Sequence, residues 1–337
     1  MRRAVRALAG KGPWRRGLVL AALALLLGLS MALHAQVPDA GGLGALGETF
    51  LPWSGAVVPV LLVAALWRRS ASAVVALLLP ALVWTSLFGS LLLDKSQSGT
   101  ADLTVVSHNV GAGNPDPAGT ARSLAASGAD LLALEELSDA ARGTYEKELA
   151  KTYPHHVVEG TVGLWSKVPL SDTEPVDVLR GNVGPLAEER LREHPEDVPE
   201  EPARALRATA ATERGPLAVY VVHLGSVRVM PRGGFWTDSR DAGLEKLTRA
   251  VTADRSERVV VLGDMNGTTD DRTFAGLTSQ LRSVQEEAGD GFGFSWPKAF
   301  PVARIDQILV RGVDPHSAWL LPATESDHLP VAAGIDW

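Results

Sequence analysis

Residues 259–267 read VVVLGDMNG, and this stretch is the clearest structural signal in the chain. Four consecutive valine and leucine residues are typical of a fully buried strand. The run breaks at a glycine, and Asp264 and Asn266 follow two residues apart, so their side chains point to the same side. A type I turn after a strand is the competing interpretation. The stretch predicts a central strand that presents an acid and an amide at its end.

Other apolar runs of the chain end in side chains of the same kinds. Carboxylate, amide and imidazole groups at strand ends can converge in one cleft, and such a cleft suits a divalent metal and a phosphate ester. The residues at or near these ends are Asn109, Glu135, Glu136, His223, Asp306, Asp327 and His328.

Read singly, these residues also have plainer interpretations. Asn109, before a glycine-rich loop, is typical of a turn, and His223 at a strand end would be structural. Glu135 and Glu136 would be surface acids, although a carboxylate at the end of a buried strand is costly unless it is paired or binds a metal. By strand alternation, the two glutamates are expected to point to opposite faces.

Asp306 lies inside the apolar run 304–310, where an acid needs a partner. His328 offers that partner, because a carboxylate beside an imidazole orients the ring and favours its charged form. We therefore expect Asp306 to orient His328.

Three arginines follow His223 in a stretch that also contains several apolar side chains. They are Arg228, Arg232 and Arg240. The planar guanidinium fits phosphate, and an apolar, cationic loop near a membrane would receive a lipid phosphate. The plainer interpretation is a surface loop with solvated arginines.

The charge of the chain is divided unevenly. Residues 1–93 carry a net charge of +6 and residues 94–337 a net charge of -13, within a total of -7. Proteins that grip a nucleic-acid backbone present a positive face, so the acidic part argues against a dedicated nucleic-acid binder. The chain has no cysteine, which excludes disulfides, thiolate zinc sites and a cysteine nucleophile.

Three apolar stretches, at about 17–33, 50–67 and 71–93, precede the motifs. Because roughly 20 apolar residues cross the hydrocarbon as a helix, they predict three transmembrane helices. The first stretch also resembles a signal peptide, with a small-residue end at 31–35. Lysine and arginine precede the first stretch and separate the second from the third. The positive-inside rule then places everything after Leu93 outside the cytoplasm, so we expect a multi-pass protein of the cell membrane.

The predicted organisation is a membrane anchor over 1–93, a polar linker over 94–101 and a catalytic domain over 102–337. In that domain, strand-like runs alternate with amphipathic stretches, which favours a layered α/β fold. Residues 187–203 are rich in glutamate and proline and are expected to form a solvated insertion. Strands are predicted at 103–108, 130–135, 160–165, 206–212, 216–224, 258–263, 304–310 and 328–335, and helices at 117–127, 139–152, 238–254 and 270–280.

In order and spacing, the motifs resemble those of the endonuclease/exonuclease/phosphatase superfamily over about residues 101–337. The resemblance implies a four-layer αββα sandwich of two facing mixed β-sheets. It also implies a metal-dependent hydrolase with Mg²⁺, or Mn²⁺, as cofactor. Glu136 would be the main metal ligand, with Asn109 and Asp327 close to the metal. The family has Gln-Glu where this chain has Glu135-Glu136, and that difference adds a negative charge beside the metal.

The same resemblance implies roles for the remaining motifs. Asp264 would position or deprotonate the attacking water, or protonate the leaving oxygen. Asn266 and His223 would hold the phosphoryl oxygens. His328, oriented by Asp306, would stabilise the transition state.

The predicted layout of three spans and an exported domain is similar to that of the VanJ/StaP-type membrane proteins linked to teicoplanin resistance. This similarity implies a phosphohydrolase acting on a lipid-linked (undecaprenyl) pyrophosphate or phosphate in the bilayer. Alternatives are an anchored extracellular nuclease, a sphingomyelinase-like phosphodiesterase, and a non-enzymatic envelope-binding module. We expect neither a nucleic-acid nor a protein partner.

Overall fold

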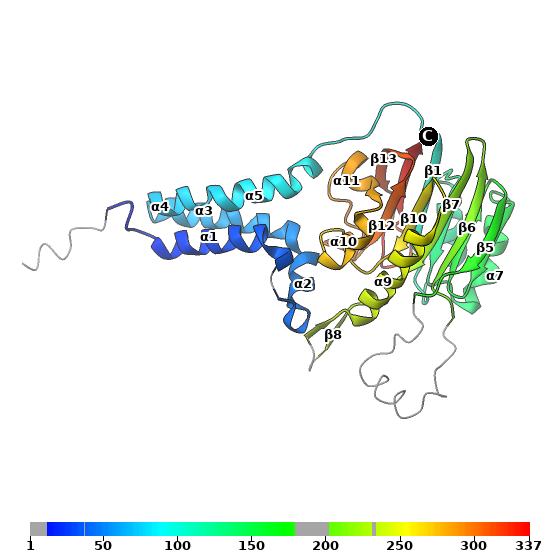
Figure 1. The fold of residues 1–337 in the computed structure, drawn as a ribbon, viewed down its shortest axis with the longest axis horizontal. Coiled ribbons are helices and arrows are strands. Elements are labelled where there is room, and N and C mark those ends of the chain that lie inside the picture. Colours follow the sequence, from blue (N-terminus) through cyan, green and yellow to red (C-terminus); the bar gives the residue numbers. More distant parts are fainter. Residues whose placement is uncertain (1–11, 37, 179–201, 231–233) are drawn as a thin grey trace, which may run out of the picture. The chain divides into compact units, whose positions relative to one another are not determined.

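The structure, a computed structural model, describes residues 12–36, 38–178, 202–230 and 234–337 (Figure 1). The chain divides into two compact units, Met1–Ser90 and Leu91–Trp337. The predicted insertion at 187–203 falls mainly outside the described residues.

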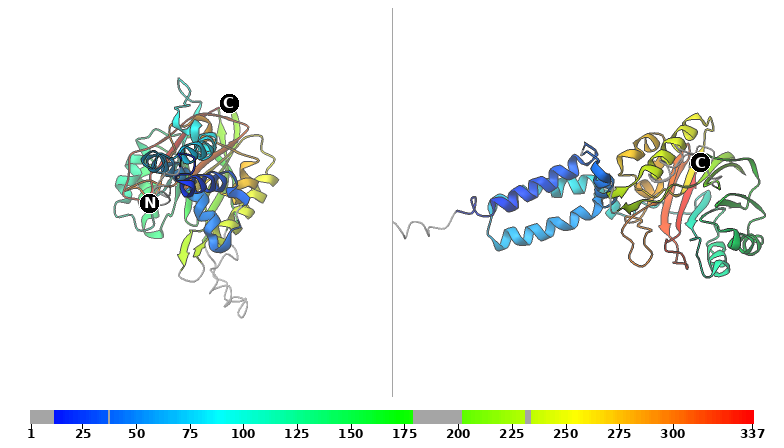
Figure 2. Two further views of the ribbon diagram at one scale, coloured as in Figure 1. Left: turned by 90° about the vertical axis from the view of Figure 1, so that its left-hand side faces the viewer. Right: turned by 90° about the horizontal axis from the view of Figure 1, so that it is seen from below.

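The first unit is helical. Its helices are α1 (Leu18–Ala32), α2 (Leu43–Thr49), α3 (Val57–Trp67), α4 (Ala71–Ala76) and α5 (Leu78–Phe88). Helix α1 packs along α4 and α5, as Figure 2 shows. The core of this helical unit is made mostly of small residues, including Ala24, Ala65 and Ala73, which allow the helices to approach closely.

Among the described residues, one helical segment, Ala71–Leu92, is long and apolar enough to cross a membrane. A second would qualify only if Ala40–Thr49 and Leu51–Trp67, which meet at a 72° bend, form one broken span. The helix Leu18–Ala32 is shorter. The three spans expected from the sequence are therefore not confirmed, and a multi-pass anchor remains a prediction.

The second unit contains two six-stranded mixed sheets, as the sequence predicted. The first sheet has the order β13 (Asp314–Leu320), β14 (Val331–Asp336), β1 (Leu103–Asn109), β2 (Leu131–Glu135), β4 (Val162–Ser166) and β3 (His155–Glu159). The second has the order β11 (Arg282–Ser283), β12 (Asp306–Arg311), β10 (Val259–Asp264), β7 (Gly215–His223), β6 (Ala205–Thr212) and β5 (Leu170–Pro175). A short hairpin of β8 (Arg228–Met230) and β9 (Gly234–Trp236) follows β7.

The two sheets face each other across one core, in which Val105 and Leu131 of the first sheet meet Val219 and Val260 of the second. Helices α6 (Pro117–Ala125) and α7 (Asp139–Leu149) cover the outer side of the first sheet. Helices α9 (Asp238–Ala253) and α10 (Ala275–Thr278) cover the second (Figure 1). A further short helix, α11 (Val284–Ala288), precedes β12.

Six strands escaped the sequence prediction. Two form the hairpin of β8 and β9, and the other four, β3, β5, β11 and β13, are the edge strands of the two large sheets. Edge strands lack the continuous apolar run of a buried strand, and nearly all of β5 is exposed. The buried central strands β1, β2, β7 and β10 were all predicted, to within two residues at each end.

Candidate active site

Strand register brings the predicted site residues to one end of the two sheets. Asp264 pairs with His223 on the parallel strand β7 and with Asp306 on the antiparallel strand β12. On the other sheet, Asn109 pairs with Glu135 on the parallel strand β2. A hydrogen bond from Asn109 Nδ2 to Asp264 Oδ2, 2.9 Å long, joins the two sheets at this end.

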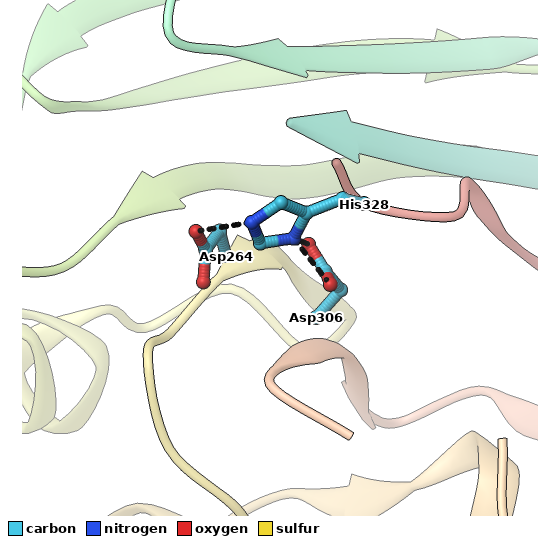
Figure 3. A group of neighbouring side chains, drawn as sticks. All are labelled: Asp264, Asp306 and His328. Carbon is cyan, nitrogen blue, oxygen red and sulfur yellow. Dashed lines mark hydrogen bonds and ion pairs between the residues drawn. The ribbon is translucent and has the colours of Figure 1, made fainter. Parts of the chain in front are cut away.

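At the centre of the site, His328 lies between two buried carboxylates (Figure 3). Its Nδ1 lies 2.9 Å from Oδ2 of Asp306, and its Nε2 lies 3.8 Å from Oδ2 of Asp264. Ser295 donates its hydroxyl to Asp306 as well, at 2.5 Å. The expected pairing of Asp306 with His328 is thus present in the structure.

The three groups shift one another's protonation. Burial alone would lower the pKa of His328, but the Asp306 carboxylate outweighs it and raises that pKa to about 10. Burial, together with the neighbouring Asp306, raises the pKa of Asp264 to about 7. His328 is therefore a cation at neutral pH, while Asp264 can take up or release a proton there.

Asn109 and Asn266 hold Asp264 from two sides. The Asn109 amide donates to Oδ2, and the backbone N–H of Asn266 donates to Oδ1 at 2.9 Å. The Asn266 side chain donates to the carbonyl oxygen of Leu224 at 3.1 Å. Asn266 has a left-handed backbone with φ of 48°, so the chain turns sharply directly after Asp264.

Glu136 lies just beyond the end of β2, in a left-handed conformation with φ of 58°. Its Oε2 accepts a hydrogen bond from the backbone N–H of Ala112 at 3.0 Å, and its Oε1 lies 3.6 Å from Nε2 of His223. The side chain is one-third exposed. Because the strand stops before it, Glu136 comes within 3.6 Å of His223, which strand alternation alone did not predict.

Glu135 is fully buried, and its Oε1 accepts a hydrogen bond from the Ser107 hydroxyl at 2.8 Å. Burial raises the pKa of Glu135 well above its usual range. Burial disfavours the charged form of this carboxyl group, which opposes the expectation that Glu135 adds a negative charge beside Glu136.

His223 contacts Arg204, a residue that the sequence reading missed. The Nη2 of Arg204 lies 2.8 Å from Nδ1 of His223 and also donates to the carbonyl of Leu224. Burial, with this guanidinium alongside, lowers the pKa of His223 well below its usual range, so the ring is neutral. Arg204 lies one residue before β6 in a segment without a motif, so only the pairing of β6 with β7 brings it to the site.

Asp327 is exposed next to His328, and its Oδ2 accepts a hydrogen bond from Nε1 of Trp296 at 3.2 Å. Arg228, also exposed, lies over the ring of Trp236 at 6.0 Å in the hairpin of β8 and β9. Arg232 lies outside the described residues.

The prediction that Arg240 binds substrate is wrong. The side chain is fully buried, and its Nη2 lies 2.6 Å from Asp271 and 2.7 Å from Asp241. It also stacks over Phe274, with 5.8 Å between the guanidinium carbon and the ring centroid. Arg240 therefore holds the loop after Asp264 against α9, and its guanidinium forms ion pairs with Asp271 and Asp241.

A divalent metal fits the oxygen donors of this site. Glu136 offers a partly exposed carboxylate, and Mg²⁺ needs only one or two protein carboxylates because it keeps several waters. Donor atoms of Asp264, Asp306 and His328 also lie within 4.8 Å of one another. Since both nitrogens of His328 face carboxylates and the ring holds its proton up to pH about 10, this group is better suited to proton transfer than to metal binding.

Comparison with known proteins agrees with this arrangement. The model described as the Endonuclease/Exonuclease/phosphatase family matches residues 106–328. No match was found among curated proteins.

Several solved structures share the fold. A functionally unknown conserved protein from Enterococcus faecalis V583 has 16% identity and a TM-score of 0.55, over 69% of this chain and 99% of its own. D. rerio TDP2 complexed with single strand DNA product has 20% identity and a TM-score of 0.53, over 70% and 99%. Beta toxin from Staphylococcus aureus has 15% identity and a TM-score of 0.51, over 68% and 99%.

Proposed function

The chain belongs to the endonuclease/exonuclease/phosphatase family, and we propose that it is a membrane-anchored, Mg²⁺-dependent phosphohydrolase acting outside the cytoplasm on a lipid-linked phosphate or pyrophosphate. Members of this family are metal-dependent hydrolases of phosphate ester bonds, so the chain is an enzyme of that class. The observation that carries the reaction is the placement of His328 between Asp306 and Asp264.

The proposed reaction follows from the charge states of the site residues. Asp264, with a pKa of about 7, positions the attacking water and takes its proton. The His328 imidazolium, held by Asp306, lies where negative charge develops on the phosphoryl oxygens. Neutral His223, alongside Arg204, donates to the phosphoryl group, together with Asn266.

Glu136 would hold the metal, with Asn109 and Asp327 near it. When bound, Mg²⁺, or Mn²⁺ in its place, would neutralise charge on the phosphate oxygens. Burial disfavours the charged form of the neighbouring Glu135, so the partly exposed Glu136 is the proposed metal ligand of the two.

The lipid-linked substrate is proposed from the chain that precedes the site. The apolar segment Ala71–Leu92 is long enough to anchor the protein, and anchoring raises the effective concentration of a substrate confined to the same bilayer. The exposed Arg228 over the half-buried ring of Trp236 combines a phosphate-binding cation with an aromatic side chain. A carrier such as undecaprenyl pyrophosphate has this chemistry. The similarity of layout to the VanJ/StaP-type proteins extends the proposal to a role in teicoplanin resistance.

Phosphate release from undecaprenyl pyrophosphate by the purified full chain tests this proposal. We expect release that requires Mg²⁺ and is lost in Asp264→Asn. Absence of release by the wild type, or equal release by the variant, would disprove it.

The proposed orientation of the protein in the membrane can be tested separately. Because the chain has no cysteine, single introduced cysteines can be labelled without background. In intact cells, a membrane-impermeant maleimide should label Ser96→Cys, while Arg69→Cys should react only after permeabilisation. The reverse pattern would place the catalytic unit in the cytoplasm and contradict the proposal.

The main alternatives are an anchored extracellular nuclease and a sphingomyelinase-like phosphodiesterase. The nuclease is favoured by the similarity in fold to D. rerio TDP2 solved with a DNA product. The net charge of -13 over residues 94–337 opposes it, because phosphate contacts supply most of the affinity for DNA. Nicking of plasmid that falls steeply with salt would favour the nuclease, and hydrolysis of sphingomyelin vesicles would favour the phosphodiesterase.

A further inference from the structure

The strands that carry Asp264 and Asp306 separate immediately beyond these two residues. Asp264 and Asp306 form the last pair between β10 and β12. A hydrogen bond from the Met265 N–H to the Ile305 carbonyl, 2.9 Å long, follows outside the ladder. Beyond it, the loop after β10 and the segment before β12 have no backbone ladder to hold them together. The ladder thus sets the spacing of the two carboxylates around His328, whereas the loop that follows Met265 is held by side chains.

A cluster of three side chains joins the two segments. Arg304, two residues before Asp306, donates through Nη2 to Oε1 of Glu286 at 2.6 Å and to the Thr269 hydroxyl at 2.8 Å. Thr269, three residues after Asn266, donates its own hydroxyl to the same Glu286 oxygen. One carboxylate oxygen therefore binds both segments.

Arg304 makes this cluster more than a surface ion pair. The Arg304 side chain is only 7% exposed, whereas that of Glu286 is 43% exposed. Removing the carboxylate would leave a buried guanidinium without this charged partner, which is costly in a way that losing an exposed pair is not. We expect the segment to move until water reaches the arginine.

Helix α11, which carries Glu286, is itself held from the start of the second unit. The Nζ of Lys95 donates to the Glu286 carbonyl at 2.5 Å. Gln97 donates its backbone N–H to the His316 carbonyl at 2.8 Å and its side-chain amide to Pro315 at 3.0 Å. The stretch predicted as a linker is thus bound to the domain at these residues, and it supports the helix that carries Glu286.

We propose that Glu286 is a positioning residue for the phosphate-ester hydrolysis, because it holds the loop that bears Asn266 against the segment that leads into Asp306. Glu286 does not contact the reacting groups. It sets the position of Asn266, whose backbone N–H donates to the Asp264 carboxylate. The inference goes beyond the proposed function, since it requires only hydrolysis of a phosphate ester and not a lipid-linked substrate.

Glu286→Gln and Glu287→Gln of the full chain form a matched pair. Glu287 lies on the same helix, is 41% exposed and pairs with Arg282 at 3.0 Å on the surface. With bis(4-nitrophenyl) phosphate as substrate, Glu286→Gln should lower kcat by about ten-fold or more, because small misplacements of reacting groups are expensive, with little change in KM. Glu287→Gln should match the wild type.

Thr269 supplies a second pair of variants, should Glu286→Gln fold poorly. Thr269→Val removes the hydroxyl and should reproduce the loss in kcat, whereas Thr269→Ser keeps it and should retain activity. Combined with Glu286→Gln, Thr269→Val should add little further loss, since both remove one joint contact.

Hydrogen exchange gives a readout that does not need turnover. Backbone amides of residues 265–272 should exchange faster in Glu286→Gln than in Glu287→Gln. Equal exchange and equal kcat in the two variants would overturn the inference. If the wild type hydrolyses undecaprenyl pyrophosphate but not this diester, the hydrogen-exchange comparison alone tests the role of Glu286. The proposed function is tested independently, by phosphate release from undecaprenyl pyrophosphate.

Discussion

Nδ1 of His328 lies 2.9 Å from Oδ2 of Asp306, inside a site in which both side chains are buried. The two residues are 22 positions apart in sequence, on β12 and on the segment before β14. Since the carboxylate helps to raise the pKa of His328 to about 10, the imidazole ring keeps its positive charge at neutral pH. A positive charge that is already present stabilises the phosphoryl transition state without a prior proton transfer to the ring.

Asp306→Asn should remove that charge. The folded pKa of His328 is raised above its unfolded value, so the contribution of the pair to stability is complete below pH 6.5 and is lost as pH rises through about 10. In the variant, the alkaline limb of the kcat profile should move down by more than one pH unit, and kcat at neutral pH should fall by about a hundred-fold.

A second pair, the buried His316 with the partly exposed Asp336 at 2.8 Å, provides the control, because it lies on β13 and β14. Asp336→Asn should change stability but neither kcat nor its pH profile. Equal profiles for the two variants would contradict the role of Asp306.

Asp264→Asn should abolish activity and yet stabilise the protein at high pH. Burial raises the folded pKa of Asp264 to about 7 from 3.8, so stability is complete below pH 3.8 and is lost as pH rises through about 7. The amide does not ionise, so above pH 7 the variant should be more stable by roughly a few kcal/mol. Urea unfolding in EDTA at acid and alkaline pH measures this, and a wild type at least as stable as the variant above pH 7 would refute it.

Substitutions of the neighbouring residues Glu135 and Glu136 should have different effects on metal binding. Glu136→Gln should weaken metal binding, and the Mg²⁺ concentration for half-maximal activity should rise by about ten-fold or more, as a ligating charge is lost. Glu135→Gln should leave that concentration unchanged, because burial disfavours the charge of this carboxyl group and the amide has nearly its shape. Titration with Mg²⁺ compares them, and an equal shift in both variants would rule out this division of roles.

Variants at Arg240 and Arg228 should have different effects, one on the stability of the protein and the other on substrate binding. Arg240→Ala leaves Asp271 buried without its cation and should cost about 3–5 kcal/mol of unfolding free energy. Arg228→Ala, at an exposed position, should leave the melting temperature unchanged and raise KM for a lipid-linked substrate. An Arg240→Ala variant with wild-type stability and a raised KM would restore the substrate-binding role that the sequence alone suggested.

Much of this architecture was predictable from residue pattern. Continuous apolar runs such as 259–262 identify the buried central strands, since burial on both faces requires apolar side chains on both. The same runs end in the polar groups of the site, so Asp264, Asp306 and His328 could be named in advance. Edge strands such as β5 carry no such signal, because solvent covers them and their composition is free to vary.

The sequence by itself determined which strands form the core and which acids, amides and imidazoles end them, because burial and strand period are local properties of the chain. Only the tertiary structure decided the states of those groups. Burial raises the pKa of Glu135, Arg240 pairs with Asp271, and Arg204 reaches His223 from the residue before β6. Charge and protonation depend on neighbours distant in sequence and on exclusion of water, which strand pairing and packing create.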